Sequence, residues 1–190
     1  MAKKAIVLLA EGFEEVEAVT PTDYLRRAGV EVTIAAIGED LVVKGSREIS
    51  IKADTTLAEL TKQGKANAGS WDAIILPGGG RAASNLAASA ESGALLKEMA
   101  GAGKLVCAIC ASPAAVLAPL GLLSGKKFTC HPGLEKMVQN AHWSHNRVVA
   151  DANIITSRAA GTAGEFAVAI ISRLLHEAEG RSIAEKVLLK

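Results

Sequence analysis

Short apolar runs alternate with stretches of helical periodicity along most of the chain. The apolar runs predict buried strands at 4–10, 30–37, 73–76, 104–109, 127–130 and within 147–157. Helical spacing of apolar positions, with glycine after the last turn as at Gly29, predicts helices at 14–28, 55–62, 81–88, 91–101, 112–118, 161–178 and 182–188. Repeated strand-then-helix units are typical of a mostly parallel sheet with helices on both faces.

We find no internal repeat, low-complexity tract or linker, so residues 1–190 are expected to form one domain. A turn at 44–47 separates two further short strands. The apolar run near the N-terminus is followed at once by Glu11, Glu14, Glu15 and Glu17, which favours a buried strand over a signal peptide. No apolar stretch is long enough to cross a membrane.

Charge and cysteine content narrow the function classes. With 21 basic and 20 acidic residues, the formal net charge is +1, which predicts no nucleic-acid or anionic-membrane surface. The three cysteines are an odd number in a chain large enough to fold without disulfides. We therefore expect free thiols and a cytoplasmic location.

Ligands of such folds bind at the carboxyl ends of the strands. The predicted carboxyl ends here carry Glu11-Gly12, Pro77-Gly78-Gly79-Gly80, Cys110 and His131. These residues are therefore the first candidates for chemistry.

Cys110 lies where a buried strand meets a helix. Small residues flank it at Ala108 and Ser112, which is the steric pattern of a nucleophile elbow. Ser112 is a suitable N-cap and Pro113 suits the first helical position. A helix N-terminus favours a thiolate, so the pattern predicts a nucleophile, against the alternative of an inert buried cysteine.

Two other readings of the cysteines are weaker. Cys107 and Cys110 form a Cys-x-x-Cys, but side chains three apart on a strand point to opposite faces, so Cys107 is expected in the core rather than in a redox dithiol. A zinc site from Cys110, Cys130 and His131 lacks metal-like spacing. We predict no metal and no cofactor.

The glycines at 78–80 follow a strand, but they match neither a dinucleotide fingerprint nor a phosphate loop. Beside a cysteine nucleophile their backbone N–H groups are suited to an oxyanion hole, although a plain strand–helix turn has the same pattern. Among the glutamates at the start of the first helix, Glu17 is one turn in. A partly buried carboxylate there is a candidate acid or base.

Three further sites are left open. His131 either assists Cys110 or simply packs. Arg47, in the predicted turn, either binds a substrate carboxylate or is solvated. His142 and His145 flank Trp143 in a polar stretch that we expect to be a surface loop.

Taken in order, several motifs resemble the ThiJ/PfpI superfamily, in its DJ-one branch, over nearly the whole chain. The matching segments are Glu11-Gly12-Phe13-Glu14-Glu15-Val16-Glu17, Leu25-Arg26-Arg27-Ala28-Gly29, Ser46-Arg47, Leu76-Pro77-Gly78-Gly79, Ala108-Ile109-Cys110-Ala111, His131-Pro132, Asn146-Arg147-Val148 and Thr156-Ser157-Arg158.

The resemblance implies a flavodoxin-like α/β sandwich that forms a homodimer. It implies that Cys110 is the reactive cysteine, that Glu17 shares a proton with it, and that the N–H groups of Gly79 and Ala111 hold an oxyanion. His131 falls where the family has a nearby histidine. Apart from the resemblance, we name Gly78 and Arg47 as candidate substrate-binding residues. We expect protonated Glu17 to donate a hydrogen bond to a Cys110 thiolate.

Functionally, the resemblance implies a cofactor-free enzyme that acts on small reactive dicarbonyls, as a glyoxalase or deglycase in carbonyl and oxidative stress defence. A redox sensor or redox-regulated chaperone that uses oxidation of Cys110 is the alternative, and a peptide or amide hydrolase is a third. The chain departs from the branch after the cysteine, at Ser112, and where the branch often has Gly-Pro-Gly-Thr, here Ala159-Ala160-Gly161-Thr162. The second departure leaves substrate preference open.

Overall fold

A seven-stranded sheet forms the centre of the protein, as seen in a computed structural model that describes residues 2–189. Its strand order is β10-β11-β7-β6-β1-β2-β5, and all neighbours are parallel except β10 and β11. The strands are β1 (Lys4–Leu9), β2 (Glu31–Ala36), β5 (Thr55–Thr56), β6 (Ala73–Leu76), β7 (Leu105–Ile109), β10 (Val148–Asp151) and β11 (Ile154–Ser157).

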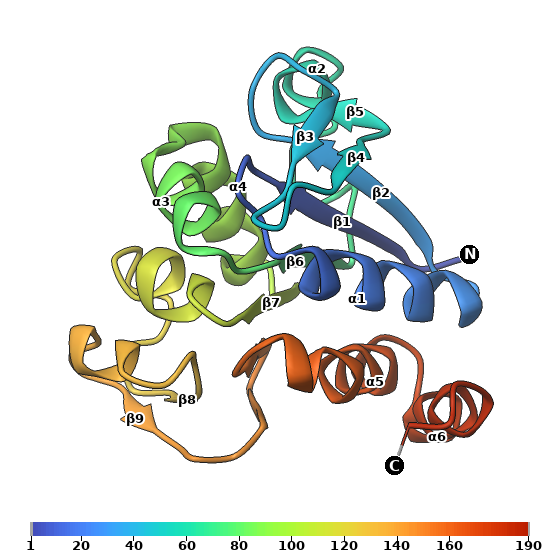
Figure 1. The fold of residues 1–190 in the computed structure, drawn as a ribbon, viewed down its shortest axis with the longest axis vertical. Coiled ribbons are helices and arrows are strands. Elements are labelled where there is room, and N and C mark those ends of the chain that lie inside the picture. The colour runs from blue at the N-terminus through green and yellow to red at the C-terminus, as the bar shows by residue number, and fades with distance from the viewer. Residues whose placement is uncertain (1, 190) are drawn as a thin grey trace.

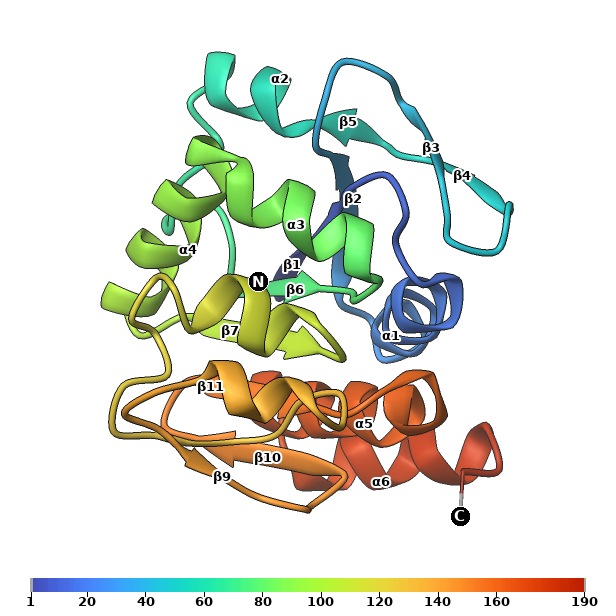
Figure 2. The same ribbon diagram turned by 60° about the vertical axis from the view of Figure 1, so that its left-hand side comes forward.

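Helices cover both faces of this sheet, which confirms the predicted flavodoxin-like architecture. They are α1 (Glu15–Arg27), α2 (Leu57–Lys62), α3 (Gly80–Ala88), α4 (Ala90–Gly101), α5 (Ala163–Leu174) and α6 (Glu177–Lys186). Figure 2 shows α3 and α4 on one side of β6 and β7, and α5 and α6 on the other. Among residues 2–189, no helix has both the length and the apolar character needed to cross a membrane.

The period-two pattern of the central strands divides the core into two layers. In β1, Ile6 and Leu8 pack into one apolar cluster, whereas Ala5 and Val7 pack into the other. The first cluster is completed by residues of α2, α3 and α4, and the second by residues of α1, α5 and α6. Because both faces are buried, these strands are almost continuously apolar, as in other parallel sheets.

Parallel pairing brings the carboxyl ends of four strands to one edge. The order β11-β7-β6-β1 places four loops side by side there. They follow Ser157, Ile109, Leu76 and Leu9. The predicted convergence of these strand ends is therefore confirmed for the segments at 11–12, 77–80 and 110, while His131 arrives from outside the main sheet.

Several predicted boundaries are wrong. The helix expected at 161–178 ends at Leu174, because Leu175 leaves the helical conformation and His176 is extended, and α6 then begins at Glu177. The helix expected at 55–62 starts two residues later, since Thr55 and Thr56 pair with β2. Propensity alone does not register such pairing with a distant strand.

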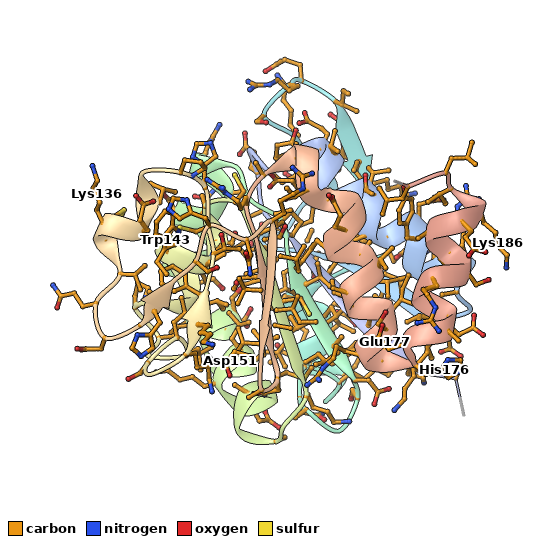
Figure 3. The ribbon with its side chains drawn as sticks, turned by 90° about the horizontal axis from the view of Figure 1, so that it is seen from below. Lys136, Trp143, Asp151, His176, Glu177 and Lys186 are labelled. Atoms are coloured by element: carbon orange, nitrogen blue, oxygen red, sulfur yellow. The ribbon has the colours of Figure 1, made fainter. Side chains whose placement is uncertain are left out.

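The structure also contains two separate two-stranded sheets. The predicted turn at 44–47 does join two strands, β3 (Val42–Lys44) and β4 (Ser50–Lys52). The surface loop predicted around Trp143 is instead partly ordered, because β9 (His142–Trp143) pairs with β8 (Lys127–Phe128). Figure 3 shows Trp143 on the same side of the view as Lys136 and opposite Lys186 in α6. In Figure 1, the β8–β9 segment lies below β7.

Candidate active site

Cys110 stands directly after β7 with a left-handed backbone. Its φ is 64°, a conformation that costs a residue with a Cβ roughly 1–3 kcal/mol and that clusters at functional sites. Its N–H donates to the Ser157 carbonyl oxygen at 3.0 Å, which ties the bend to β11. Cys110 is partly exposed, whereas Cys107 and Cys130 are fully buried. The strand–turn–helix geometry is that of a nucleophile elbow.

The bend also changes the relation between the two cysteines of the Cys-x-x-Cys. Cys107 is in the core, as predicted, but Cys110 packs against the same apolar cluster. The expectation of opposite faces fails because the strand ends at Ile109, before Cys110. All three thiols are free.

Ser112 does not cap the following helix, contrary to the prediction. It is already helical, with φ −63° and ψ −34°, and its side chain makes no capping bond. Its buried hydroxyl instead donates to the Pro77 carbonyl oxygen at 2.6 Å. The helix itself is a single π-type turn, η1 (Pro113–Leu117), a form often found at functional sites. Ser112 thus fastens the cysteine loop to the glycine-rich loop after β6.

Gly79 occupies a position that only glycine fits. Its φ is +95°, and an added Cβ would lie 2.2 Å from the Gly12 carbonyl oxygen. The backbone N–H groups of Gly79 and Ala111 both act to lower the pKa of the Cys110 thiol, so both lie close to its sulfur. The two backbone donors predicted for an oxyanion hole therefore meet at Cys110.

Glu17 points from α1 to the same place and is only 1% exposed. Its Oε2 accepts a 2.8 Å hydrogen bond from the Gly78 N–H. An added Cβ at Gly78 would lie 2.5 Å from both Glu17 Oε2 and Cys110 Cβ, so the two side chains meet over the bare face of this glycine. The Gly78 N–H therefore binds the Glu17 carboxyl group and is not free to bind a substrate.

The two side chains titrate as a pair. Burial raises the pKa of Glu17 to about 7, and the negative charge of Glu14 adds to the rise, while the Gly78 N–H and the Cys110 thiol oppose it. Burial and the Glu17 carboxylate raise the pKa of Cys110 to about 12, against the N–H groups of Gly79 and Ala111. Between about pH 7 and pH 12 the pair therefore holds one proton and one negative charge. The two pKa values favour an ionised Glu17 beside a neutral Cys110 thiol, whereas we expected a thiolate beside a protonated Glu17; burial and the Glu17 charge outweigh the N–H groups that stabilise the thiolate.

The other glutamates of α1 have structural partners. Glu14 is the N-cap, and its Oε2 accepts from the Glu17 N–H at 2.9 Å. Glu15 is buried and accepts from the Arg47 N–H at 2.6 Å. The sequence singled out Glu17 as the candidate acid or base from its position one turn into the helix, but it did not predict the partners of Glu14 and Glu15.

His131 and Arg47 are not brought into the site through their side chains. The His131 N–H donates to the Cys110 carbonyl oxygen at 2.8 Å, but the residue is exposed and its Nδ1 lies 3.1 Å from the Pro132 carbonyl oxygen. Arg47 is exposed, and the hydrogen bond that holds it is made by its backbone. Across residues 2–189, no three His, Cys, Asp or Glu side chains cluster closely enough to hold a metal ion.

Comparison with known proteins shows the family of this chain. The model of the DJ-1/PfpI family matches residues 3–173. The Parkinson disease protein 7 homolog of Danio rerio is 40% identical over 191 residues, covering 99% of this chain and 98% of that protein. A deglycase of Pyrococcus horikoshii is 34% identical over 82% of this chain and 89% of that protein. The chain spans only 45% of the protein DJ-1 homolog A of Arabidopsis thaliana, at 41% identity.

Solved structures show the same fold. A mutant of a DJ-1 superfamily protein from Salmonella typhimurium superposes with a TM-score of 0.92 at 37% identity, covering 99% of both chains. Oxidized DJ-1 of Toxoplasma gondii gives a TM-score of 0.92 at 36% identity, covering 98% of both chains.

Proposed function

Because this chain belongs to the DJ-1/PfpI family, we propose that it is a cofactor-independent cysteine enzyme that converts small reactive dicarbonyls to hydroxy acids. The name of the Pyrococcus horikoshii relative, a deglycase, supports chemistry on carbonyl compounds. The dicarbonyl taken as the test substrate is methylglyoxal, and the product is lactate.

One observation carries the proposal. A single partly exposed thiol, that of Cys110, is met at the same point by two backbone N–H donors and by a buried carboxyl group. The donors, from Gly79 and Ala111, suit an oxygen anion formed on a carbonyl carbon bound to sulfur. The carboxyl group of Glu17 has a pKa near 7, so it exchanges protons in either direction at neutral pH.

The reaction needs no external oxidant or reductant, because the aldehyde carbon is oxidised while the neighbouring ketone carbon of the same molecule is reduced. The Cys110 sulfur attacks the aldehyde carbon, and the N–H groups of Gly79 and Ala111 bind the oxygen of the hemithioacetal. Glu17 removes the hydrogen on that carbon as a proton, and the former ketone oxygen takes up a proton, which gives an enediol. Glu17 then returns its proton to the neighbouring carbon as the hemithioacetal hydroxyl loses its own, which leaves an alcohol beside a thioester. Water hydrolyses the resulting thioester, which releases the hydroxy acid and restores the thiol.

The redox sensor is the second candidate, supported by the likeness to an oxidized relative. Peroxide would oxidise Cys110 to a sulfinate, and the same N–H groups and a protonated Glu17 would hold its oxygens. The hydrolase alternative needs a histidine base, and the described contacts of the His131 ring lead to Pro132 instead.

The experiment is turnover of methylglyoxal by the purified protein without glutathione and in the presence of a chelator, with lactate followed by NMR. Cys110→Ser should abolish lactate formation. Cys107→Ser is the matched control, because it makes the same change at a fully buried thiol and should retain turnover.

Absence of lactate with the wild-type protein would reject the enzyme and favour the sensor. Loss of activity with chelator and its return with zinc would reject cofactor independence.

A further inference from the structure

The peptide unit between Cys110 and Ala111 carries two groups of the candidate site at once. Its N–H belongs to Ala111 and is one of the two donors proposed for the oxyanion, while its carbonyl belongs to Cys110. All peptide units of residues 2–189 are trans. In a trans peptide unit the C=O and the N–H lie in one plane and point in opposite directions. A group that binds the Cys110 carbonyl oxygen therefore also sets the direction of the Ala111 N–H.

The backbone of His131 binds that carbonyl oxygen. The His131 N–H donates to it at 2.8 Å, and within residues 2–189 no other donor to this oxygen is found. The imidazole has no part in the bond, because the side chain is exposed and its Nδ1 lies 3.1 Å from the Pro132 carbonyl oxygen. The contact between His131 and the site is thus made by the main chain alone.

The segment that carries His131 is itself fixed to the sheet. Thr129, two residues earlier, is fully buried, and its N–H donates to Thr156 Oγ1 in β11 at 2.9 Å. The next residue of β11, Ser157, accepts the Cys110 N–H at 3.0 Å. Strand β11 therefore anchors the His131 segment and also binds the peptide unit before Cys110. Both peptide units that flank the cysteine are held in this way.

The second oxyanion donor is held by the same arrangement from the other side of the site. The Gly79 N–H shares its peptide unit with the Gly78 carbonyl, and the Glu14 N–H donates to that carbonyl oxygen at 3.0 Å. Each donor thus has a backbone N–H bound to the carbonyl at the opposite edge of its own peptide unit. Two unrelated loops show this arrangement, which favours a hole that is formed before substrate binds.

Without the bond from His131, the peptide unit after Cys110 would be free to turn over. Such a rotation needs only opposite changes in ψ of Cys110 and φ of Ala111, and Cys110 already has a strained left-handed backbone with a φ of 64°. The rotated unit would direct a carbonyl oxygen toward the place of the oxyanion. Fixed donors favour the reaction because they need no reorganisation while charge develops on the substrate.

We propose that His131 is a positioning residue that acts through its backbone: its N–H holds the Cys110 carbonyl and thereby keeps the Ala111 N–H directed at the oxyanion. As a statement about catalysis this rests on the proposed function, but the hydrogen bond and the direction of the peptide unit do not. The imidazole of His131 is dispensable on this view, whereas the N–H is not.

An exchange of amide for ester removes this N–H with little change in shape. Lactic acid built into the full chain at position 131 leaves an ester oxygen in place of the N–H and a methyl side chain. His131→Ala is the matched control, because it has the same side chain and keeps the N–H.

Two measurements compare these proteins. With methylglyoxal, kcat of the ester variant should fall about 10- to 100-fold below that of His131→Ala with little change in KM, somewhat less than the loss expected when an oxyanion donor is deleted. Labelling of Cys110 by iodoacetamide at pH 8 should slow by about three- to tenfold in the ester variant, because a donor that turns away no longer stabilises the thiolate. His131→Ala should stay within about twofold of wild type in both, as expected for an exposed side chain.

Equal kcat values and equal labelling rates in the ester and alanine variants would overturn the proposal. A full loss in His131→Ala would also overturn it, because the role would then belong to the imidazole. If the ester variant does not fold, hydrogen exchange of the wild-type His131 amide decides. Although the residue is exposed, this amide should exchange at least about 100-fold more slowly than a free amide, and unprotected exchange overturns the proposal. Because labelling and hydrogen exchange need no substrate, a wild type that forms no lactate would reject the proposed function alone.

Discussion

At the scale of single residues, the protein places two groups that both disfavour ionisation in direct contact. Burial raises the pKa of Glu17 and of Cys110, and each negative charge opposes the other. Such an arrangement costs stability, and in a core without a reaction to perform it would be replaced by apolar side chains. Paired groups with strongly shifted pKa values are instead typical of catalytic sites.

The contribution of Glu17 to the free energy of unfolding has a predictable dependence on pH. The pKa of Glu17 rises from 4.5, its ordinary value, to about 7 on folding, so its contribution to stability is fully present below about pH 4.5 and is lost as the pH rises through 7. Glu17→Gln removes this titration. Its free energy of unfolding relative to wild type should therefore increase between pH 4 and pH 8 by on the order of 3 kcal/mol. Urea unfolding of both proteins at several pH values measures this difference. A difference in the free energy of unfolding that does not change with pH would contradict the prediction.

The same variant separates stability from catalysis. Glutamine keeps the size of the side chain and an oxygen that can accept the Gly78 N–H, but it cannot move a proton. Methylglyoxal turnover should fall by about 10²–10⁴-fold, while iodoacetamide still labels Cys110. Turnover close to wild type would remove Glu17 from the mechanism.

At the scale of elements, the site is made by junctions rather than by the interiors of helices and strands. Four neighbouring strands end at one edge, and the loops after β6 and β7 supply Gly78, Gly79 and Cys110. The glycine-rich loop after β6 is the most tightly constrained of these, because it touches both the loop after β1 and the side chains of Glu17 and Cys110.

Two adjacent glycines of this loop provide a matched pair for testing the constraint. Gly79→Ala would bring a Cβ to 2.2 Å from the Gly12 carbonyl oxygen at a φ of +95°, so we expect a loss of more than about 2 kcal/mol in the free energy of unfolding. Gly80→Ala meets nothing within 4 Å at the start of α3 and should change stability by less than about 1 kcal/mol. Equal losses in the free energy of unfolding for the two variants would contradict this prediction, because they would mean that the loop can shift to accommodate a Cβ at position 79.

At the scale of the whole molecule, an apolar stripe on α1 has no cover within the described chain. Val16 and Val19, which are one turn apart, are 47% and 50% exposed. The hairpin of β3 and β4 likewise exposes Ile49 in its turn, at 59%. These side chains support the homodimer that we proposed from the family resemblance, since surfaces of this kind mark protein contacts.

Val19→Asp should therefore weaken the dimer, because it places a charge in an interface that would be buried. Sedimentation at micromolar concentration should show the wild type above the 19.6 kDa of one chain and the variant shifted toward it. Leu188→Asp is the control: it makes a similar apolar-to-acid change at a side chain that is 87% exposed beyond α6. A wild type that sediments only as one chain would contradict the dimer.

The sequence alone determined the layered sheet, the strand ends and the cysteine elbow. Those features depend on local order: continuous apolar runs predict buried strands, and small residues around Cys110 predict a tight bend. The family resemblance, now confirmed by the matches, added which residues belong together. The predicted end of the long helix at residue 178 was wrong, because the apolar periodicity continues beyond Leu175, where the backbone leaves the helical conformation.

Only the tertiary structure decided which polar groups meet. Glu14, Glu15 and Glu17 are the same residue type within one turn of helix, and the packing of α1 on the sheet gives each a different partner. Glu14 caps the helix, Glu15 binds the Arg47 backbone N–H, and Glu17 lies beside the Cys110 thiol. Ser112 was expected to cap a helix but binds a loop 35 residues away. Contacts of this kind depend on how separate strands and helices are placed in space, which local sequence does not encode.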